Sequence, residues 1–193
     1  MNTLFIGIVL ISLLFPCYSV LCQDTTLDAF RDEYYAINTT SMGVLGSWAL
    51  LNITTGIYGS LHSQEDKKAF WQMNAGWNII NIAIAGFGYY AKPELYDFQS
   101  AIHQQSSMQQ LLALNIGLDI AYMLGGLYLK EKSNTTSQAQ LLGFGNSLIV
   151  QGAFLLLFDC ALYTTHHQHG KHLESIIKHI YPLSSGIGCS IPF

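Results

Sequence analysis

Charged residues are so sparse and so unevenly spaced in this chain that they leave four long apolar stretches, each with a strongly polar residue near its middle. The 193 residues include 8 Lys and Arg and 12 Asp and Glu, 10% in all, whereas a typical soluble domain carries about 25%. The stretches approach the length of about 20 residues with which a helix crosses the hydrocarbon core of a bilayer. The sequence therefore predicts a polytopic membrane protein with spans at 41–61, 70–91, 108–129 and 140–163.

A further apolar segment lies at the N-terminus. Residues 4 to 15 are apolar, and Val20 and Cys22 stand three residues and one residue before the predicted start of the mature chain. This arrangement predicts a secretory signal peptide over residues 1–22. The segment has no Lys or Arg before its apolar part, which leaves an uncleaved anchor helix as an alternative. Either form delivers segment 23–40 to the outer side of the membrane.

Amphipathic segments flank the predicted bundle, which occupies residues 41–163. Apolar residues recur at helical spacing in segment 23–40 and again in the tail, residues 164–193, and each set predicts a short helix resting on the outer membrane surface. The two sets are Leu27, Phe30, Tyr34 and Ile37, and Leu173, Ile176, Ile177 and Ile180. The expected fold is thus all-α: an integral membrane up-down four-helix bundle with a cleaved signal peptide and short amphipathic flanking helices.

The positions of the lysines predict the orientation. Lys67 and Lys68 lie between the first two spans, Lys130 and Lys132 lie between the last two, and an up-down bundle puts both connections on one side. The positive-inside rule assigns that side to the cytoplasm. Both ends of the mature chain are then outside, on the periplasmic side of a bacterial inner membrane. The net charge of −4 offers no basic face for phosphates, so nucleic acid is not an expected partner.

One polar residue falls near the middle of each predicted span, and these four are expected to form a layer at the bilayer midplane. The layer consists of Asn52, Asn81, Asp119 and Gln151. An ionisable Asp at the bilayer centre costs at least about 2.5–3.5 kcal/mol, so it should face the bundle interior and be paired or protonated, with the amides as partners. Helical spacing adds three residues to the same inner faces, which are Asn74, Asn78 and Asn115.

This layer allows two interpretations. In the first, its side chains form interhelical hydrogen bonds, each worth only about 0.6 kcal/mol, that fix the register of the helices. In the second, Asp119 is the centre of a proton, ion or small-ligand site, since intramembrane carboxylates are commonly functional. Asp159 stands nearer the outer edge, where the simplest expectation is a hydrogen bond to Tyr163 or to a neighbouring helix end.

A histidine cluster follows the last span and is the only metal-like grouping in the sequence. It consists of His166, His167, His169 and His172. Pairs at i, i+3 could converge on zinc or copper, whereas an exposed tail interrupted by Gly170 favours little or no metal binding, so no cofactor is expected. The sequence has no Gly-x-Ser-x-Gly elbow, HExxH pair or Walker loop, and no catalytic residue is predicted.

The second span and the end of the fourth carry a further pattern. It consists of Phe70-Trp71-x-Met73-Asn74-x-x-Trp77-x-x-x-Asn81, followed by Leu-Phe-Asp159. This pattern resembles an uncharacterised family, a domain of unknown function, of small bacterial polytopic integral membrane proteins. The resemblance would cover residues 40–165. It implies a membrane bundle and no known ligand or activity, and it leaves the histidine cluster outside.

The functional expectation is accordingly broad. The leading hypothesis is a non-enzymatic structural or accessory bundle that contacts the lipid bilayer and either another membrane protein or a second copy of itself. The alternatives are a small proton- or ion-coupled transporter centred on Asp119 and an outer-surface metal-binding membrane protein.

Overall fold

The computed structural model describes residues 27–92, 97–178, 180–183 and 186–189. These residues form four helices, which are α2 (Leu27–His62), α3 (Glu65–Tyr90), α4 (Phe98–Thr136) and α5 (Ala139–Lys178). Two short strands follow, β1 (Ile180–Leu183) and β2 (Gly186–Cys189), which pair antiparallel with Ile180 opposite Cys189. The predicted signal peptide, residues 1–22, lies outside the described residues.

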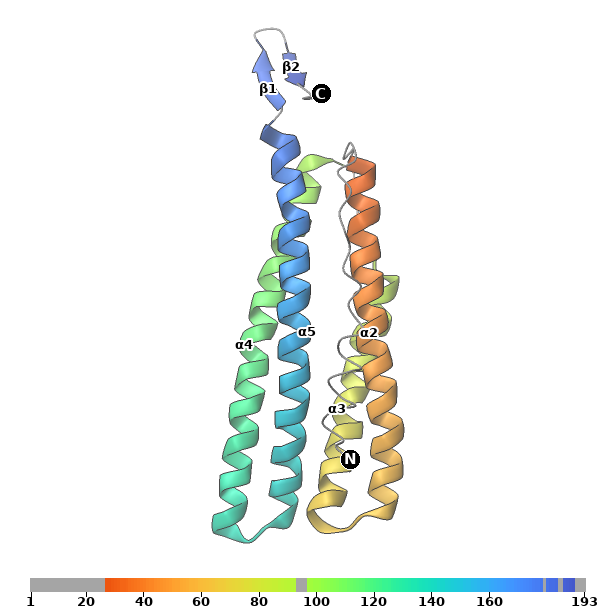
Figure 1. Ribbon diagram of the computed structural model, residues 1–193, viewed down its shortest axis with the longest axis vertical. Coiled ribbons are helices and arrows are strands. Elements are labelled where there is room, and N and C mark those ends of the chain that lie inside the picture. The colour runs from red at the N-terminus through yellow and green to blue at the C-terminus, as the bar shows by residue number, and fades with distance from the viewer. Residues whose placement is uncertain (1–26, 93–96, 179, 184–185, 190–193) are drawn as a thin grey trace, which may run out of the picture.

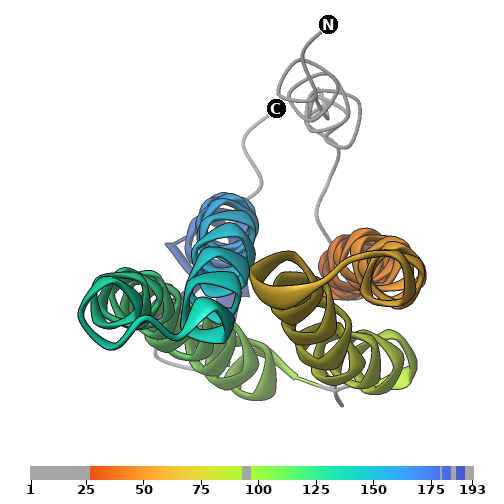
Figure 2. The same cartoon turned by 90° about the horizontal axis from the view of Figure 1, so that it is seen from below.

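The four helices run alternately up and down (Figure 1). The α2–α3 and α4–α5 connections lie at the same end of the bundle, and Figure 2 shows the four helices from that end. Each connection is only two residues long, and Ser137 in the second adopts a left-handed conformation with φ 54°. The expected four-helix, all-α bundle is therefore confirmed. The terminal hairpin of β1 and β2 was not predicted.

The start of α4 is fixed by a reciprocal capping box. A side-chain oxygen of Asp97 accepts a hydrogen bond from the backbone N–H of Ser100 at 2.7 Å, and the hydroxyl of Ser100 lies 3.1 Å from the backbone nitrogen of Asp97. These contacts satisfy backbone donors that have no partner within the helix. They also lower the pKa of the Asp97 carboxyl, because the backbone N–H of Ser100 stabilises its charged form.

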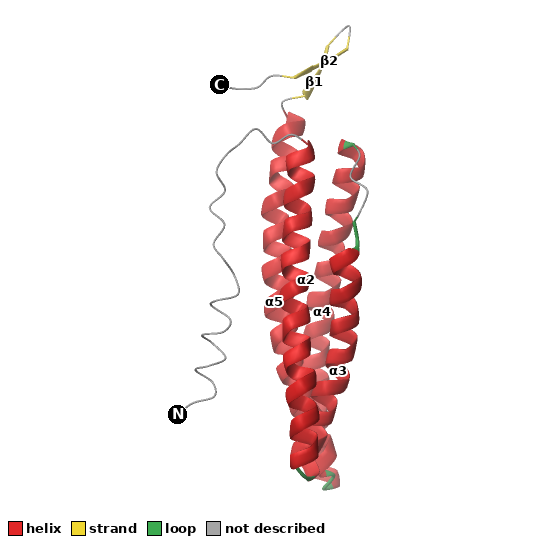
Figure 3. Ribbon diagram, turned by 90° about the vertical axis from the view of Figure 1, so that its right-hand side faces the viewer, coloured by secondary structure: helices red, strands yellow, loops and turns green. Residues whose placement is uncertain are grey.

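The flanking segments differ from the sequence expectation. The segment that begins at Leu27 is the first part of α2, and the chain beyond 163 continues α5 as far as Lys178, so neither described segment is a separate surface helix. Figure 3 shows both as continuous rods. The physical reason is the absence of a helix breaker: no Pro or Gly occurs from Leu27 to Met42, and Gly170 alone costs a helix only about 1 kcal/mol. Lys130 and Lys132 likewise belong to α4 rather than to a loop.

The helices are long relative to a bilayer. At about 1.5 Å per residue, the 40 residues of α5 extend about 60 Å, twice the roughly 30 Å of a hydrocarbon core. Two helices, α4 over Gln99–Thr136 and α5 over Ala139–Lys171, are long and apolar enough by length and composition to cross a membrane. A bundle of this length has room for a segment within the membrane and a segment beyond it.

Glycines allow the closest approach between α4 and α5. A Cβ atom added at Gly126 would lie 2.6 Å from the carbonyl oxygen of Gly145, and one added at Gly145 would meet the carbonyl oxygen of Gly126 as closely. Gly143 packs in the same way against the backbone of α3 at Asp66. Small residues at a helix interface let the two backbones approach closely and increase the van der Waals contact between the helices.

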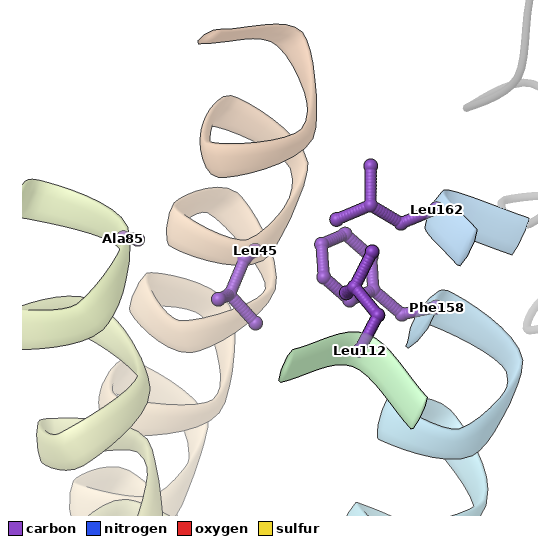
Figure 4. Close-up of a cluster of buried hydrophobic side chains, with 5 residues drawn as sticks. All are labelled: Leu45, Ala85, Leu112, Phe158 and Leu162. Carbon is purple, nitrogen blue, oxygen red and sulfur yellow. The ribbon is translucent and has the colours of Figure 1, made fainter. Parts of the chain in front are cut away.

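Two clusters of buried apolar side chains lie at different heights in the bundle. The first brings all four helices together and consists of Leu45, Ala85, Leu112, Phe158 and Leu162 (Figure 4). The second joins α2, α4 and α5 toward the end that carries β1 and β2, and consists of Phe30, Tyr34, Ala101 and Leu173. Between and beside these clusters the interior is polar, which is where the candidate site lies.

Candidate functional site

Amide side chains from three helices form one hydrogen-bonded layer. The indole Nε1 of Trp48 donates to Oε1 of Gln151 at 3.1 Å, and Nδ2 of Asn74 donates to Oδ1 of Asn52 at 2.8 Å. Nε2 of Gln151 in turn donates to the side-chain oxygens of Asn52 and Asn74. Asn52 closes the layer by donating to the backbone carbonyl of Trp48 at 2.8 Å. The layer therefore connects α2, α3 and α5.

The amide layer continues along the inner face of α3. Nδ2 of Asn78 donates to the backbone carbonyl of Asn74 at 2.8 Å, and Nδ2 of Asn81 donates to Oδ1 of Asn78 at 3.1 Å. All three asparagines are buried, and Ala85 extends the stripe into the apolar cluster of Figure 4. The i, i+4, i+7 spacing places these side chains on one face, so a single helix supplies three of the five amides of the layer.

Asp119 and Asp159 form a second polar group between α4 and α5. Their side chains lie within hydrogen-bonding reach of each other, and the two residues are only 3% and 6% exposed. Side chains on a helix lean toward its N-terminus, so on two antiparallel helices Asp119 and Asp159 lean toward each other. Oδ2 of Asp119 is buried and has no hydrogen-bond partner among the described residues.

The predicted midplane layer is thus divided into two parts. Asn52, Asn81 and Gln151 belong to the amide layer, whereas Asp119 bonds to Asp159 and makes no described hydrogen bond to those amides. Asn115 is half-buried on α4, one turn before Asp119. Asp159 also differs from expectation, because it is buried beside Asp119 rather than accessible at an outer edge.

Tyr163 makes no described hydrogen bond to the carboxyl pair. It packs against the apolar cluster of Leu45, Phe158 and Leu162, and its ring is parallel to that of His167 at a centroid distance of 6.2 Å. The expected hydrogen bond from Tyr163 to Asp159 is therefore replaced by the contact between the two carboxyl groups.

The histidine cluster is split between the interior and the surface. His166 and His169 are buried against Tyr34 and Phe30, with the rings of Phe30 and His169 stacked at 4.0 Å, whereas His167 is exposed. The side chain of His172 lies outside the described part of the structure. Within that part, no three His, Cys, Asp or Glu side chains are grouped so that they could hold a metal ion.

His166 has an unusual environment for a titratable group. It is fully buried, its backbone carbonyl accepts a hydrogen bond from Nε2 of Gln105, and neither ring nitrogen has a hydrogen-bond partner among the described residues. This position lies beyond the predicted spans. Burial, with a smaller contribution from His169, lowers the pKa of His166 to about 4, so the ring is neutral at pH 7. Burial also raises the pKa of Tyr34.

Comparison with known families identifies the bundle but no activity. The model of a family of unknown function, DUF6992, matches residues 44–160, which is more than half of the chain. The chain belongs to DUF6992. The searches of curated proteins and of solved structures gave no significant match.

The part of the chain that matches DUF6992 contains both polar groups of the site. Residues 44–160 include Trp48, the amide layer and the pair of Asp119 and Asp159. The match leaves out Phe30, Tyr34, His166 and His169, which form the buried cluster at the other end of α2 and α5. The family assignment therefore concerns the polar interior of the bundle and not its histidines.

Several contacts of the site were not predicted from the sequence. Trp48 stands one turn before Asn52 on the inner face of α2, and that spacing was the available signal for its contact with Gln151. Burial of His166 and His169 is signalled by their i, i+3 spacing, which places them on one side of α5, with His167 on another. No local signal in the sequence indicates that Gln105 of α4 contacts His166.

Proposed function

We propose that this DUF6992 protein is an integral membrane protein with four spans, whose amide layer holds the helices in register and which acts as a non-enzymatic structural or accessory bundle. The observation that most strongly supports this proposal is the distribution of side chains, which is the reverse of that in a soluble protein. Asn52, Asn74, Asn78 and Gln151 are buried, while large apolar side chains of every helix are exposed. Soluble domains rarely expose contiguous apolar surface of this extent.

The exposed apolar residues support spans in α2 and α3 as well as in α4 and α5. With one exception, Ile102, all of them fall within the four predicted spans. They are Leu50, Leu51, Ile57, Tyr58, Leu61, Ile79, Ile80, Ile84, Phe87, Tyr89, Tyr90, Leu111, Leu114, Leu118, Ile120, Leu124, Leu127, Tyr128, Val150 and Leu157. Lipid acyl chains would cover this surface, and the tyrosines at its ends suit the membrane–water interfaces. The partners in this proposal are the bilayer and either another membrane protein or a second copy.

The amide layer supports a structural role because its groups satisfy one another. Each amide of Asn52, Asn74 and Gln151 takes part in a hydrogen bond to another helix. In hydrocarbon no water is available to replace these partners. The layer therefore fixes which residues of α2, α3 and α5 face one another.

A fractionation experiment tests the membrane proposal. We expect the full-length chain to remain in the membrane pellet after an alkaline carbonate wash and to be released only by detergent. Single cysteines at Asn134 and Asp97, in a chain whose own cysteines are replaced, test the orientation. Both positions are exposed, and an impermeant reagent applied to whole cells should label Asp97→Cys and not Asn134→Cys. Release by carbonate would contradict the membrane location, and the reverse labelling would contradict the orientation.

A second candidate function, proton- or ion-coupled transport centred on Asp119, is favoured by its hydrogen bond to Asp159. In liposomes, the parent protein would then dissipate a pH or cation gradient, and Asp119→Asn would abolish the flux without loss of fold. A parent protein that gives no flux above empty liposomes would contradict this candidate and leave the structural proposal standing.

A further inference from the structure

The carboxyl groups of Asp119 and Asp159 are buried within hydrogen-bonding reach of each other, and a hydrogen bond between them requires a proton. An ionised carboxylate is an acceptor only, so two of them cannot hydrogen-bond to each other. One carboxyl must be protonated, and its O–H then donates to the other. Two negative charges within hydrogen-bonding reach of each other in a buried site also repel strongly, which is why paired carboxylates share a proton.

The surroundings offer the pair no compensating positive charge. The only charged group found to act on Asp159 in the described structure is Asp119 of α4, and the only one found to act on Asp119 is Asp159 of α5. The buried polar side chains that the structure describes on α2 and α3 are all neutral amides, which are Asn38, Asn52, Asn74, Asn78 and Asn81. A Lys or Arg in the pair's vicinity would permit two carboxylates, and none is described there.

Oδ2 of Asp119 is an independent observation that indicates a bound proton. This atom is buried and has no described partner, and Gly152 of α5 packs closely against the backbone of the same residue. A full negative charge on an unpartnered buried oxygen is costly. Protonation lowers that cost, and a proton is the smallest ligand that a closely packed α4–α5 interface can accept.

We infer that Asp119 and Asp159 form a proton-binding site, in which a single proton is held between the two carboxyl groups at neutral pH. One of the two carboxyl groups carries the proton as its O–H and donates it in a hydrogen bond to the carboxylate of the other. Release breaks that O–H bond, yields H⁺ and leaves two carboxylates, whose repulsion opposes the α4–α5 contact. Rebinding of one proton reverses the step. Proton binding is thus coupled to the packing of α4 against α5.

This inference deepens the second candidate function and takes the surroundings of the pair from the proposed membrane bundle. Its test is a direct count of protonated carboxyl groups, which requires no flux. Infrared spectra of the full-length protein in lipid nanodiscs at pH 7 should show the carbonyl stretching band of a protonated carboxyl, with an intensity of about one group per chain. Solvent-exposed Asp and Glu are ionised at this pH and do not contribute.

Three variants decide the origin of the band. Asp119→Asn and Asp159→Asn each leave one carboxyl beside an amide donor, and both should abolish the band. Asp32→Asn, at an exposed position on α2, should keep it. A band absent from the parent protein, or unchanged in both pair variants, would overturn the inference. Loss of the band when sodium replaces choline at constant pH would also overturn it, because the pair would then bind the cation.

Further measurements on the same samples distinguish a failure of this inference from a failure of the proposals on which it rests. Circular dichroism and thermal unfolding in nanodiscs report whether each variant folds, and the parent spectrum needs no variant at all. If the membrane proposal is wrong, alkaline carbonate will release the protein from the membrane pellet. If the transport proposal is wrong, liposomes that contain the protein will show no flux above empty liposomes. The protonated band can be present or absent in either case.

Discussion

Nε1 of Trp48 donates a hydrogen bond to Oε1 of Gln151 across 103 residues of sequence, and this contact joins α2 directly to α5. The indole ring of Trp48 also stacks on Phe154 at a centroid distance of 3.8 Å, one turn from Gln151. A hydrogen bond and an aromatic stacking contact thus join the same two helices. Gln151 is the residue through which the α2–α3 hairpin and α5 share one set of hydrogen bonds.

Replacement of Gln151 should loosen the bundle. Gln151→Leu keeps the volume but leaves the indole N–H of Trp48 and Oδ1 of Asn74 without their partner, which we expect to cost about 1–2 kcal/mol. The measurement is thermal unfolding in detergent. Gln110→Leu, at an exposed position where the only hydrogen bond of the amide among the described residues is to Ser106, is the matched control and should not lower the midpoint. Equal effects of the two changes would contradict a structural role for the layer.

Stability and charge can be separated at Asp119. Asp119→Asn keeps a polar side chain that can donate to Asp159, so the unfolding midpoint should stay close to that of the parent protein. Asp119→Leu removes the partner of a buried carboxyl and should cost about 1–2 kcal/mol. Chemical unfolding of the two variants in the same detergent provides the comparison. A loss in Asp119→Asn as large as that in Asp119→Leu would show that the amide cannot replace the carboxyl.

Close packing of α4 and α5 predicts a large loss of stability when a single methyl group is added to a glycine at their interface. Gly126→Ala would place its Cβ 2.6 Å from the carbonyl oxygen of Gly145 and must push the helices apart, at a cost of about 1–3 kcal/mol. Gly117→Ala lies on the same helix with open space around it. We expect that control to be neutral or slightly stabilising, since Ala favours helix by up to about 1 kcal/mol. Thermal midpoints in the opposite order would argue against this packing.

The sequence predicted the helices well because their pattern is local. Sparse charge defined the four stretches, and the i, i+4, i+7 spacing of Asn74, Asn78 and Asn81 correctly placed them on one face. The ends of the helices were less predictable, because continuation past position 163 depends on how the chain beyond Tyr163 packs. Phe30 and Tyr34 of α2 cover His166 and His169 there, and that tertiary contact outweighs Gly170 within the helix.

The pairing of Asp119 with Asp159 was not predictable from position along each span. Counting from the estimated span ends put Asp119 level with the amides and Asp159 close to the outer interface. Their contact depends on the axial shift between α4 and α5, which is set by glycines such as Gly126 and Gly145, and on the opposite lean of side chains on antiparallel helices. Depth along the spans therefore did not indicate the contact of Asp119 with Asp159.

The split histidine cluster predicts little metal binding. His167 points away from the buried pair of His166 and His169, and a stable site needs three or four converging ligands. We expect no stoichiometric uptake of zinc or copper by the purified protein at neutral pH, as measured by elemental analysis after dialysis. Tight binding of one ion per chain, lost in His167→Ala and in His169→Ala, would revive the metal hypothesis.

The neutral ring of His166 predicts a loss of stability in acid. Its pKa is lowered to about 4 in the folded protein, against an ordinary value of about 6.5 for an accessible histidine. Between these two values the unfolded chain binds more protons than the folded one, so stability falls as pH falls. The contribution is complete above pH 6.5 and is lost progressively toward pH 4, and it amounts to about 3 kcal/mol because one pKa unit corresponds to about 1.4 kcal/mol.

Replacement of this one ring should flatten that acid dependence. His166→Leu has no group to protonate and fills an interior that already offers the imidazole nitrogens no described partner, so its unfolding midpoint should fall less than that of the parent between pH 7 and pH 4.5. The control is His167→Leu, whose exposed ring is one residue away. It should keep the full acid sensitivity, and the two variants separate burial from the mere presence of histidine. Parallel curves for the parent and His166→Leu would assign the acid sensitivity to another group.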